Sequence, residues 1–281
     1  MSLLANKYMG KESQITVAVN GALGRMGQTV MSAVNADDAT QLVAGIDAAA
    51  SSVTVSAPGT SEVPLGPDAA SVIAATSPQV IVDFSNATGA MDVARAAIPA
   101  GVRLVSGSTG LSADDLKEIE TMVTSAGTGA ISAPNFAMGA VLLTHLARIA
   151  SKYFDYADLL ESHHEAKIDA PSGTALAIAE AMAEGRGAEF DQNIAEKETL
   201  AGTRGGSYSG INVHSARMPG RVARHEVVFG ATGQTLTMIH DSINRESFMP
   251  GVLMAVKQVM VQNGLVVGLD KVLGLDDGGK P

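Results

Sequence analysis

The sequence predicts an α/β protein, in which a Rossmann-like, doubly wound parallel sheet precedes a smaller α+β domain with a mixed, largely antiparallel sheet. Short apolar runs alternate with helical patterns through the first half, and a glycine-rich turn follows the first run. Such alternation is typical of a parallel sheet covered by helices on both faces. Later in the chain, strand patterns follow one another without a helix between them, which indicates an α+β domain.

The first half supplies the strands of the predicted parallel sheet. Five apolar runs are expected to form these strands: residues 15–19, 42–46, 80–84, 102–105 and 130–133. Helices are expected after the first, third and fourth runs, one ending near residue 34, one spanning 91–98 and one beginning near 113. Right-handed crossovers between parallel strands then place helices on both faces of the sheet.

The second half begins with a predicted helix at 141–154 and a strand at 157–161. A long polar, glycine-rich loop is expected at 186–210 and a last helix at 247–261. Glycines at positions 230 and 233 indicate a hairpin turn. Antiparallel strands are expected on either side of this turn and just before it, at residues 211–217, 221–229 and 234–241.

Composition narrows the range of functions. A length of 281 residues suggests about two domains. The net charge of −10 argues against nucleic acid or an anionic membrane as a partner, so any anion site must be a local positive pocket. The chain has no cysteine, which excludes disulfides, thiolate metal sites and cysteine nucleophiles. Because residues 1–13 lack a signal-peptide core and no apolar run reaches membrane-spanning length, we expect a cytoplasmic protein.

The glycine-rich turn indicates a dinucleotide site. Gly21, Gly24 and Gly27 are spaced G-x-x-G-x-x-G between the first strand and the first helix, where backbone N–H groups can approach a pyrophosphate. Asp47 ends the second strand, where an acid would accept the ribose hydroxyls of an adenosine. No basic residue follows at 48–50 to bind a 2′-phosphate, which favours NADH over NADPH, although Arg25 in the turn could partly compensate. A glycine turn that serves packing only and a solvated loop acid are the alternatives.

Two more loops end predicted strands of the parallel sheet. Residues 107–110 follow the fourth strand, and residues 133–136 follow the fifth. Ligands of such folds bind at the carboxyl edge of the sheet, so both loops are candidates for cofactor contacts. The alternative for each loop is ordinary turn chemistry.

An unusual concentration of positive charge and hydrogen-bond donors lies in residues 161–175, ESHHEAKIDAPSGTA. His163 and His164 are adjacent, so in an extended segment they point to opposite faces and are poorly placed to bind one metal ion together. Ordinary histidines, one buried and one in solvent, are the plain alternative. Lys167 and the turn before the next helix favour a functional interpretation.

The helix after this turn provides an anion site. Ser172 is placed to cap a helix running from Thr174 to about residue 183, and the N–H groups at that end attract a carboxylate. Lys167 supplies a charge for a second carboxylate. We therefore expect a small, doubly anionic substrate. A histidine held among these groups can donate a proton near neutral pH, because its reference pKa is about 6.5.

With these features in place, residues 161–175 resemble the signature of the 4-hydroxy-tetrahydrodipicolinate reductase family, also called dihydrodipicolinate reductase. Further stretches are similar to the family: residues 24–27, 83–85, 107–110, 133–136, 217–226 and 248–251. The resemblance therefore extends from about residue 15 to the C-terminus.

The resemblance implies an oxidoreductase that reduces 4-hydroxy-tetrahydrodipicolinate or dihydrodipicolinate to tetrahydrodipicolinate, on the diaminopimelate route to lysine. NADH or NADPH supplies the hydride. It also implies a homotetramer assembled through the C-terminal sheets. The expected domains are a dinucleotide-binding domain, 1–138 joined by 249–281, and a substrate-binding and tetramerisation domain, 139–248.

The resemblance also implies roles for single residues. His163 and Lys167 serve proton transfer, and the substrate carboxylates are held by His164, Gly173 and Thr174. The cofactor contacts implied are Gly21, Ala22, Leu23, Gly24, Arg25, Met26, Asp47, Gly107, Ser108, Thr109, Ala133, Pro134, Asn135 and Phe136. No metal ligand is implied.

Four other functions account for the sequence less well. An aspartate-semialdehyde dehydrogenase needs a cysteine nucleophile, which the chain lacks. A homoserine-type dehydrogenase stays possible, but it leaves the pattern of His163, His164 and Lys167 unexplained. A nucleotide-sensing regulator or an inactive NAD-binding partner would bring a basic recognition module or lose His163 or Lys167, and neither is observed.

Overall fold

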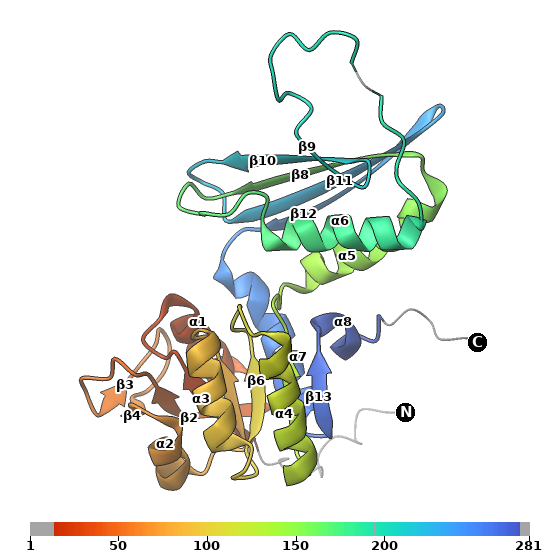
Figure 1. Ribbon diagram of the computed structural model, residues 1–281. Helices are drawn as coiled ribbons and strands as arrows, with labels where there is room; N and C mark the ends of the chain where they lie inside the picture. The colour runs from red at the N-terminus through yellow and green to blue at the C-terminus, as the bar shows by residue number, and fades with distance from the viewer. Residues whose placement is uncertain (1–13, 194, 276–281) are drawn as a thin grey trace, which may run out of the picture. The chain divides into compact units, whose positions relative to one another are not determined.

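The computed structural model describes residues 14–193 and 195–275, and these residues form two compact units (Figure 1). The first unit holds the described chain up to Phe136 together with Met249–Val272. The second holds Ala137–Phe248 and residues 273–275. The chain therefore leaves the first unit once and returns to it. The expected boundaries, after residues 138 and 248, lie close to these, although the prediction placed residues 273–275 with the first unit.

The sheet of the first unit is doubly wound, as the sequence predicts. Its strand order is β13-β7-β6-β5-β1-β2-β4-β3, and all neighbours pair in parallel except β3 and β4. The strands are β1 Ile15–Asn20, β2 Thr40–Ile46, β3 Thr54–Val55, β4 Val63–Gly66, β5 Val80–Asp83, β6 Arg103–Ser106, β7 Gly129–Ser132 and β13 Gly264–Val267. The chain order reverses at β1, between β2 and β5, which is the place where such sheets bind ligands.

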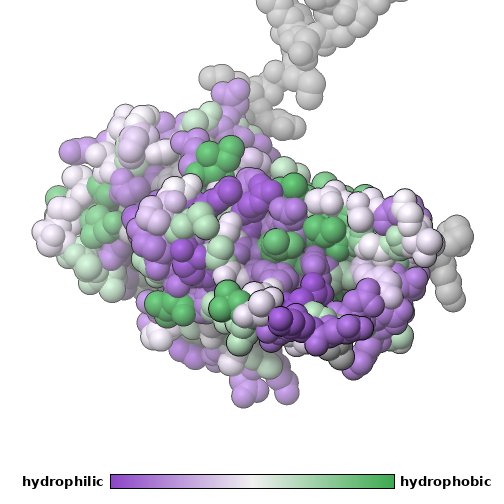
Figure 2. Space-filling view, turned by 90° about the horizontal axis from the view of Figure 1, so that it is seen from above, coloured by the Kyte–Doolittle hydropathy of each residue, from purple (hydrophilic) through white to green (hydrophobic). Residues whose placement is uncertain are grey.

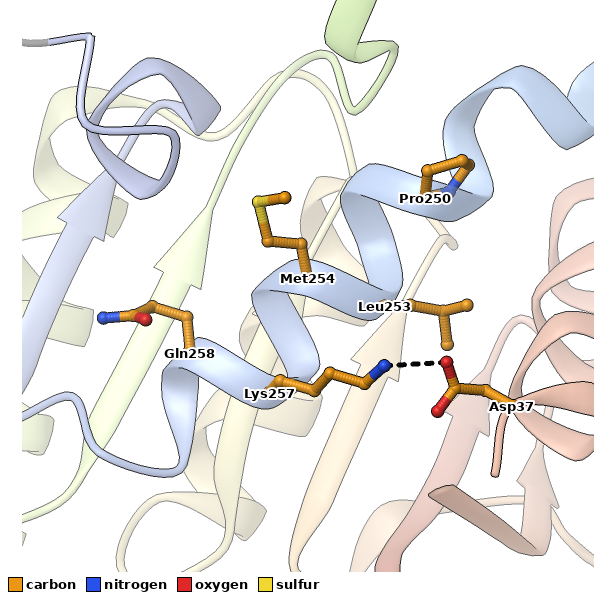
Figure 3. A pocket seen from close by; sticks show the side chains of 6 residues that line it. All are labelled: Asp37, Pro250, Leu253, Met254, Lys257 and Gln258. Carbon is orange, nitrogen blue, oxygen red and sulfur yellow. Dashed lines mark hydrogen bonds and ion pairs between the residues drawn. The ribbon is translucent and has the colours of Figure 1, made fainter. Parts of the chain in front are cut away.

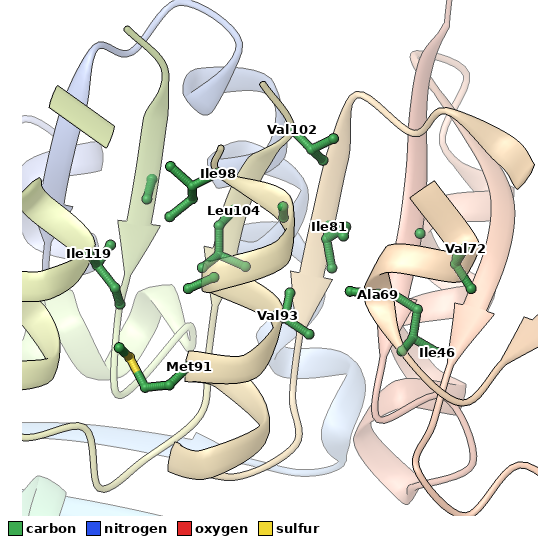
Figure 4. Packing of buried hydrophobic residues seen from close by; sticks show 14 of the residues in the cluster. Ile46, Ala69, Val72, Ile81, Met91, Val93, Ile98, Val102, Leu104 and Ile119 are labelled. Carbon is green, nitrogen blue, oxygen red and sulfur yellow. The ribbon is translucent and has the colours of Figure 1, made fainter. Parts of the chain in front are cut away.

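Helices cover both faces of this sheet. They are α1 Arg25–Ala36, α2 Ala69–Thr76, α3 Ala87–Ala97, α4 Ala113–Ala126, α7 Met249–Val259 and α8 Leu269–Val272. Helices α2, α3 and α4 pack on one face, where their side chains form a core with strand residues such as Ile46, Ile81 and Leu104 (Figure 4). Helices α1 and α7 pack against each other. Helix α1 also contacts β1 and β2, and α7 contacts β6 and β7.

Local sequence explains where several helices begin and why the last one returns. Asp68 and Asn86 cap α2 and α3, and Ser112 forms a capping box at the start of α4. Helix α7 buries Val252 and Val256 completely. Burying a side chain of this size is worth about 1.5–3 kcal/mol, so α7 belongs to the core of the first unit.

The second unit is a five-stranded mixed sheet with α5 Met138–Ala150 and α6 Gly173–Arg186 on one face (Figure 1). Its strand order is β12-β11-β8-β10-β9. The strands are β8 Tyr156–His163, β9 Gly206–Tyr208, β10 Ile211–Arg217, β11 Ala223–Ala231 and β12 Gln234–Ser242. Short 3-10 helices follow α5 at Ser151–Tyr153 and precede α7 at Arg245–Phe248.

One expectation for this sheet is wrong. Strand β10 was expected to be antiparallel, but it pairs in parallel with β8 and is antiparallel only to β9. The connection from β8 to β10 contains α6, and such a helical crossover allows parallel pairing. The hairpin is confirmed: β11 and β12 pair from Ala223–Ser242 to Ala231–Gln234, and Gly233 has a φ of +77° in the turn.

The sheet of the second unit has two different faces. Side chains such as Leu159, Val227 and Phe229 face α5 and α6 and are fully buried. Their sequence neighbours face the other way because side chains alternate along a strand. On that outer face, Leu160 and Ile239 are 40% and 50% exposed. Figure 2 looks onto this part of the molecule from above and shows hydrophobic patches interspersed with hydrophilic ones.

Candidate cofactor and catalytic sites

The turn between β1 and α1 requires glycine at two positions. Gly21 has a φ of +76°, and a Cβ there would lie 2.8 Å from the carbonyl oxygen of Phe84. A Cβ on Gly27 would lie 2.0 Å from the carbonyl oxygen of Gly21. Gly24 is the N-cap of α1 and offers no side-chain cap, unlike the caps of α2, α3 and α4. The first N–H groups of α1 are thus suited to an anionic ligand.

The other predicted contact residues of this turn differ in exposure. Ala22 is fully buried, whereas Leu23 is 44% exposed. Arg25 and Met26 open α1, with Arg25 exposed and Met26 half-buried. An exposed leucine and arginine at the start of the helix are free to contact a bound molecule.

The structure brings Asp47 beside this turn. One carboxylate oxygen of Asp47 accepts a hydrogen bond from the N–H of Leu23 at 3.0 Å, and the other accepts one from the N–H of Ala49 at 3.0 Å. The backbone N–H of Asp47 donates to the carbonyl of Gly66. The acid is therefore held in place at the end of β2, where the sequence predicts a contact with a ribose.

The loops after β6 and β7 lie at the same edge of the sheet. The N–H of Gly107 donates to the carbonyl of Asp83, and the N–H of Ala133 donates to the carbonyl of Ser106. A Cβ on Gly107 would lie 2.2 Å from the ring of Phe84, which in turn contacts the ring of Phe136 at 5.7 Å between centroids. The loops are therefore packed around one phenylalanine.

Side chains in these loops differ in exposure. Thr109 and Pro134 are exposed, and Asn135 is half-buried. Ser108 is buried, and its hydroxyl has no hydrogen-bond partner among the described residues. A buried hydroxyl without a partner is costly, so a bound molecule that supplied one would be favoured here.

A polar network that the sequence did not reveal joins the ends of three central strands. Asp83 is fully buried at the end of β5. Its carboxylate accepts hydrogen bonds from the side chains of Asn20 at 2.7 Å, Ser85 at 2.6 Å and Ser106 at 2.7 Å. The signal in the sequence was a polar residue ending each of β1, β5 and β6. The network holds the strand ends, and hence the loops after them, in register.

His163 ends β8 on the inner face of the second sheet. It is 7% exposed, and its Nδ1 lies 2.5 Å from a carboxylate oxygen of Glu161. His164 is exposed, which confirms that the two histidines do not share one environment. Among the described residues no group of acidic and histidine side chains is arranged to hold a metal ion.

The carboxylate of Glu161 joins three elements. Arg217 on β10 donates to both of its oxygens, at 3.0 and 2.9 Å, and the backbone N–H of Ser172 donates to one of them at 3.2 Å. Burial alone would raise the pKa of Glu161, but hydrogen bonds from Arg217, Ser215 and His163 bring it below its usual value. Glu161 is therefore ionised at neutral pH.

The pKa of His163 is lower than the sequence suggests. Burial lowers the pKa below the usual 6.5, and the charges of Lys167 and Arg217 lower it further, while Glu161 offsets part of the effect. The expectation of an imidazole that titrates near its reference value is thus corrected, because the ring is buried. Without a bound anion, His163 is largely neutral at pH 7.

The sequence predicts an anion site at Lys167 and the start of α6. Lys167 Nζ donates to the carboxylate of Asp169 at 2.7 Å, and the N–H of Gly173 also donates to that carboxylate. Ser172 caps α6 by accepting a hydrogen bond from the N–H of Ala175 at 3.1 Å, as predicted. Gly173 is exposed and Thr174 is half-buried. A carboxylate of the chain itself therefore occupies the donors expected for a ligand.

Two further histidines lie on the next two strands of the sheet, β11 and β12. His225 on β11 packs its ring against that of His163, with centroids 5.3 Å apart, and its Nε2 lies 3.2 Å from the hydroxyl of Ser172. Burial lowers the pKa of His225 to about 4. His240 on β12 pairs with His225, and burial lowers its pKa too. Only strand pairing brings these residues together, so spacing along the chain could not indicate them.

A surface depression on the first unit is lined by residues that the sequence did not predict as site residues. A depression of about 470 Å³ is lined by Asp37 and by Pro250, Leu253, Met254, Lys257 and Gln258 of α7 (Figure 3). An ion pair of 2.7 Å joins Lys257 to Asp37 across it. None of the predicted site residues lines this depression.

Comparison with known proteins agrees with these features. Residues 15–136 match the family described as "Dihydrodipicolinate reductase, N-terminus", and residues 139–273 match "Dihydrodipicolinate reductase, C-terminus". The 4-hydroxy-tetrahydrodipicolinate reductase of Dehalococcoides mccartyi (strain CBDB1) is 44% identical, covering 93% of this chain and 99% of the relative. That of Geobacillus kaustophilus (strain HTA426) is 43% identical, covering 92% and 99%.

Solved structures are similar as well. A dipicolinate-bound dihydrodipicolinate reductase from Paenisporosarcina sp. TG-14 matches with a TM-score of 0.83 and 38% identity, covering 92% of this chain and 99% of that one. An amine dehydrogenase from Mycobacterium smegmatis matches with a TM-score of 0.63 at 16% identity, which indicates a shared fold only.

Proposed function

The chain belongs to the dihydrodipicolinate reductase family, and from this premise we propose which of its residues carry out the family's reaction. The protein is an NAD(P)H-dependent oxidoreductase that reduces 4-hydroxy-tetrahydrodipicolinate, or dihydrodipicolinate, to tetrahydrodipicolinate in lysine biosynthesis. The observation that carries this conclusion is the agreement of both halves of the chain with the two family descriptions.

The cofactor binds to the first unit, at the carboxyl edge of the parallel sheet. The residues there suit a dinucleotide. Gly21 and Gly27 leave no room for a side chain, so the backbone can approach a ligand closely. The buried hydroxyl of Ser108 has no hydrogen-bond partner among the described residues, so a bound cofactor could supply one. Bound NAD(P)H supplies a hydride to the substrate ring. Asp47 favours NADH, because its carboxylate accepts ribose hydroxyls and repels a 2′-phosphate.

The substrate is a small dicarboxylate held at the start of α6. One carboxylate takes the donors of Lys167 and Gly173, which Asp169 occupies when no substrate is bound. His164 and Thr174 hold the rest of the substrate. The related reductase from Paenisporosarcina binds dipicolinate, which supports a ligand of this class. The negative charge of the substrate raises the pKa of His163 and so favours its protonated form.

His163 and Lys167 serve the proton transfer. After hydride addition, the enamine-like product of the reduced ring needs a proton, and the imidazole of His163 is held rigidly for that task by Glu161. Lys167 orients the substrate and stabilises the negative charge that develops on the ring before it is protonated.

Substitution tests these roles. His163→Ala is expected to lower kcat by about 10²–10⁴-fold while NADH still binds, because only the proton donor is lost. Lys167→Ala should lower kcat and raise the KM for the substrate. His145→Ala on α5 and Lys152→Ala after it are matched controls outside the site. Steady-state assays and NADH fluorescence titration measure both effects, and unchanged turnover of His163→Ala would refute its role.

The outer face of the second sheet supports assembly into a homotetramer. Leu160 and Ile239 are partly exposed there, flanking Glu226 on the strand between them. Exposed apolar side chains on an uncovered sheet face are suited to contact another copy. Sedimentation should give a particle of four chains, and a monomer at working concentration would refute this assembly.

A further inference from the structure

We propose that Glu161 is a positioning residue that holds the proton of His163 on Nδ1, so that His163 exchanges its catalytic proton at Nε2, and that Arg217 keeps Glu161 ionised for this purpose. This role deepens the proposed function, since it rests on the part of His163 in proton transfer. It concerns two residues, Glu161 and Arg217, that lie behind the imidazole and are not assigned any contact with substrate or cofactor.

The geometry of β8 commits one nitrogen of His163 to Glu161. The two residues are two positions apart on the strand and therefore face the same side of the sheet. The side chain of Glu161 is 0% exposed and that of His163 is 9% exposed. Their contact of 2.5 Å is at the short end for a hydrogen bond to a charged group. Nδ1 is thus committed to Glu161, and Nε2 is the nitrogen left for exchange.

The direction of this hydrogen bond follows from the charge of Glu161. An ionised carboxylate only accepts, so Nδ1 must carry the hydrogen. Arg217 is aligned with His163 on the neighbouring strand and donates to both oxygens of Glu161, which a protonated carboxyl could not accept equally well. Because neutral imidazole has one N–H, fixing it on Nδ1 leaves the lone pair on Nε2.

The transferred proton is the one on Nε2. In the charged form both nitrogens of His163 carry a hydrogen. Donation breaks the Nε2–H bond, passes that proton to the reduced substrate and leaves the neutral Nδ1–H form that Glu161 favours. The groups that face His163 are Glu161 on its own strand, Arg217 on β10, His225 on β11 and Lys167 in the following loop. Glu161 is the only acid among these groups, so it alone favours the charged form.

Glu161 also links His163 to the anion site. The same carboxylate accepts a hydrogen bond from the N–H of Ser172, the N-cap of α6. The N–H of Gly173, the next residue, is one of the proposed carboxylate donors. One buried acid therefore aligns the proton donor with the helix end that holds the substrate. Apolar residues of similar volume often stabilise a fold as well as a buried ion pair does. The stability of the fold alone therefore does not explain why Glu161 and Arg217 are paired here.

The test compares Glu161→Gln with Glu180→Gln, which makes the same change at an exposed position of α6. Glu161→Gln is expected to lower kcat by about 10²-fold, the low end for disabling an acid–base group. The KM for NADH should stay within about twofold. The alkaline limb of the kcat/KM profile should move to lower pH, because His163 loses its one acidic neighbour. A purely structural role would leave that limb in place.

Nitrogen NMR of His163 provides an independent readout. In the unchanged protein the neutral ring should be the Nδ1–H tautomer, and in Glu161→Gln the Nε2–H form should appear. Arg217→Lys, which keeps the charge but cannot bridge both oxygens, should lower kcat less than Glu161→Gln and shift the pH profile in the same direction. If Glu161→Gln does not fold, the tautomer of the unchanged protein and the pH profile of Arg217→Lys still test the role of Glu161.

The outcomes separate this proposal from the proposed function. If His163→Ala loses turnover while Glu161→Gln keeps both wild-type kcat and pH profile, the positioning role is refuted and the role of His163 stands. An Nε2–H tautomer in the unchanged protein also refutes it. If His163→Ala itself keeps full turnover, the proposed proton donor is wrong, and the positioning role falls with it.

Discussion

The carboxylate of Asp169 lies 2.7 Å from Lys167 Nζ and also accepts a hydrogen bond from the N–H of Gly173. These are the two donors proposed for a carboxylate of the substrate. The hydrogen bond from Lys167 lowers the pKa of Asp169, so this side chain is ionised at neutral pH. The side chain of Asp169 is 48% exposed. In the proposed binding mode, an incoming carboxylate therefore competes with an acid of the chain for the same donors.

Asp169→Asn is expected to lower the KM for the substrate, because the competing charge is removed. An exposed ion pair is worth at most about 1 kcal/mol, which corresponds to a change of about fivefold. Turnover should change little. Glu165→Gln is the matched control, since Glu165 is an exposed acid in the same loop. Initial-rate measurements give both constants. A higher KM in Asp169→Asn would mean that Asp169 holds Lys167 in its binding position.

Asp47 should decide the choice between cofactors. In the proposed role, the carboxylate of Asp47 accepts hydrogen bonds from the ribose hydroxyls, and its negative charge repels a 2′-phosphate. Asp47→Asn removes this charge, so kcat/KM for NADH should fall by about tenfold or more. The value for NADPH should fall less, or rise. Glu120→Gln on the exposed side of α4 is the control. Equal losses with both cofactors would show that Asp47 holds the glycine turn through Leu23 without selecting the nucleotide.

Gly27→Ala should disable cofactor binding. The new Cβ would lie 2.0 Å from the carbonyl oxygen of Gly21, so the turn must move out of its present shape. Since the helix N-terminus is aimed by this turn, NADH affinity is expected to fall by about tenfold or more, measured by fluorescence titration. Gly206→Ala, where a Cβ meets nothing within 4 Å, should bind NADH normally. Retained affinity in Gly27→Ala would show that backbone contacts of this turn do not bind the cofactor.

Local patterns in the sequence predict the strands that carry strong apolar runs. Strands β1, β2, β5, β6 and β7 are such runs, and they lie where expected. Strand β13 was missed because its residues Gly264–Val267 are only partly buried at the sheet edge, so a short run of this kind resembles a helix end. The parallel pairing of β10 depends on a crossover through α6, which no local pattern records.

The residues of the candidate site also differ in whether the sequence could indicate them. His163, Lys167 and the cap residue Ser172 lie in one short stretch, so their spacing indicated an anion site. Arg217 reaches Glu161 from 56 positions along the chain, through the pairing of β10 with β8. Strand pairing alone also brings His225 to His163. Spacing could therefore indicate the donors of the site but not the groups that orient them and set their pKa values.

The buried histidines predict that stability falls in acid. Burial, and then the charge of His163, lower the pKa of His225 to about 4, whereas an unfolded histidine titrates near 6.5. Between these values the unfolded state binds the proton and the folded state does not. The stabilising effect is therefore complete above pH 6.5 and is lost as the pH falls towards 4. The difference of pKa corresponds to about 3 kcal/mol.

Urea unfolding at pH 7 and at pH 4.5 measures this loss. His225→Gln keeps a polar group near the hydroxyl of Ser172 but cannot take up the proton, so the free energy of unfolding should depend less steeply on pH than in the unchanged protein. Burial also lowers the pKa of His163 and His240, so part of the slope should remain. His145→Gln on α5 is the control and should keep the full slope. An unchanged slope in His225→Gln would mean that His225 is already protonated, or exposed, in the folded state at these pH values.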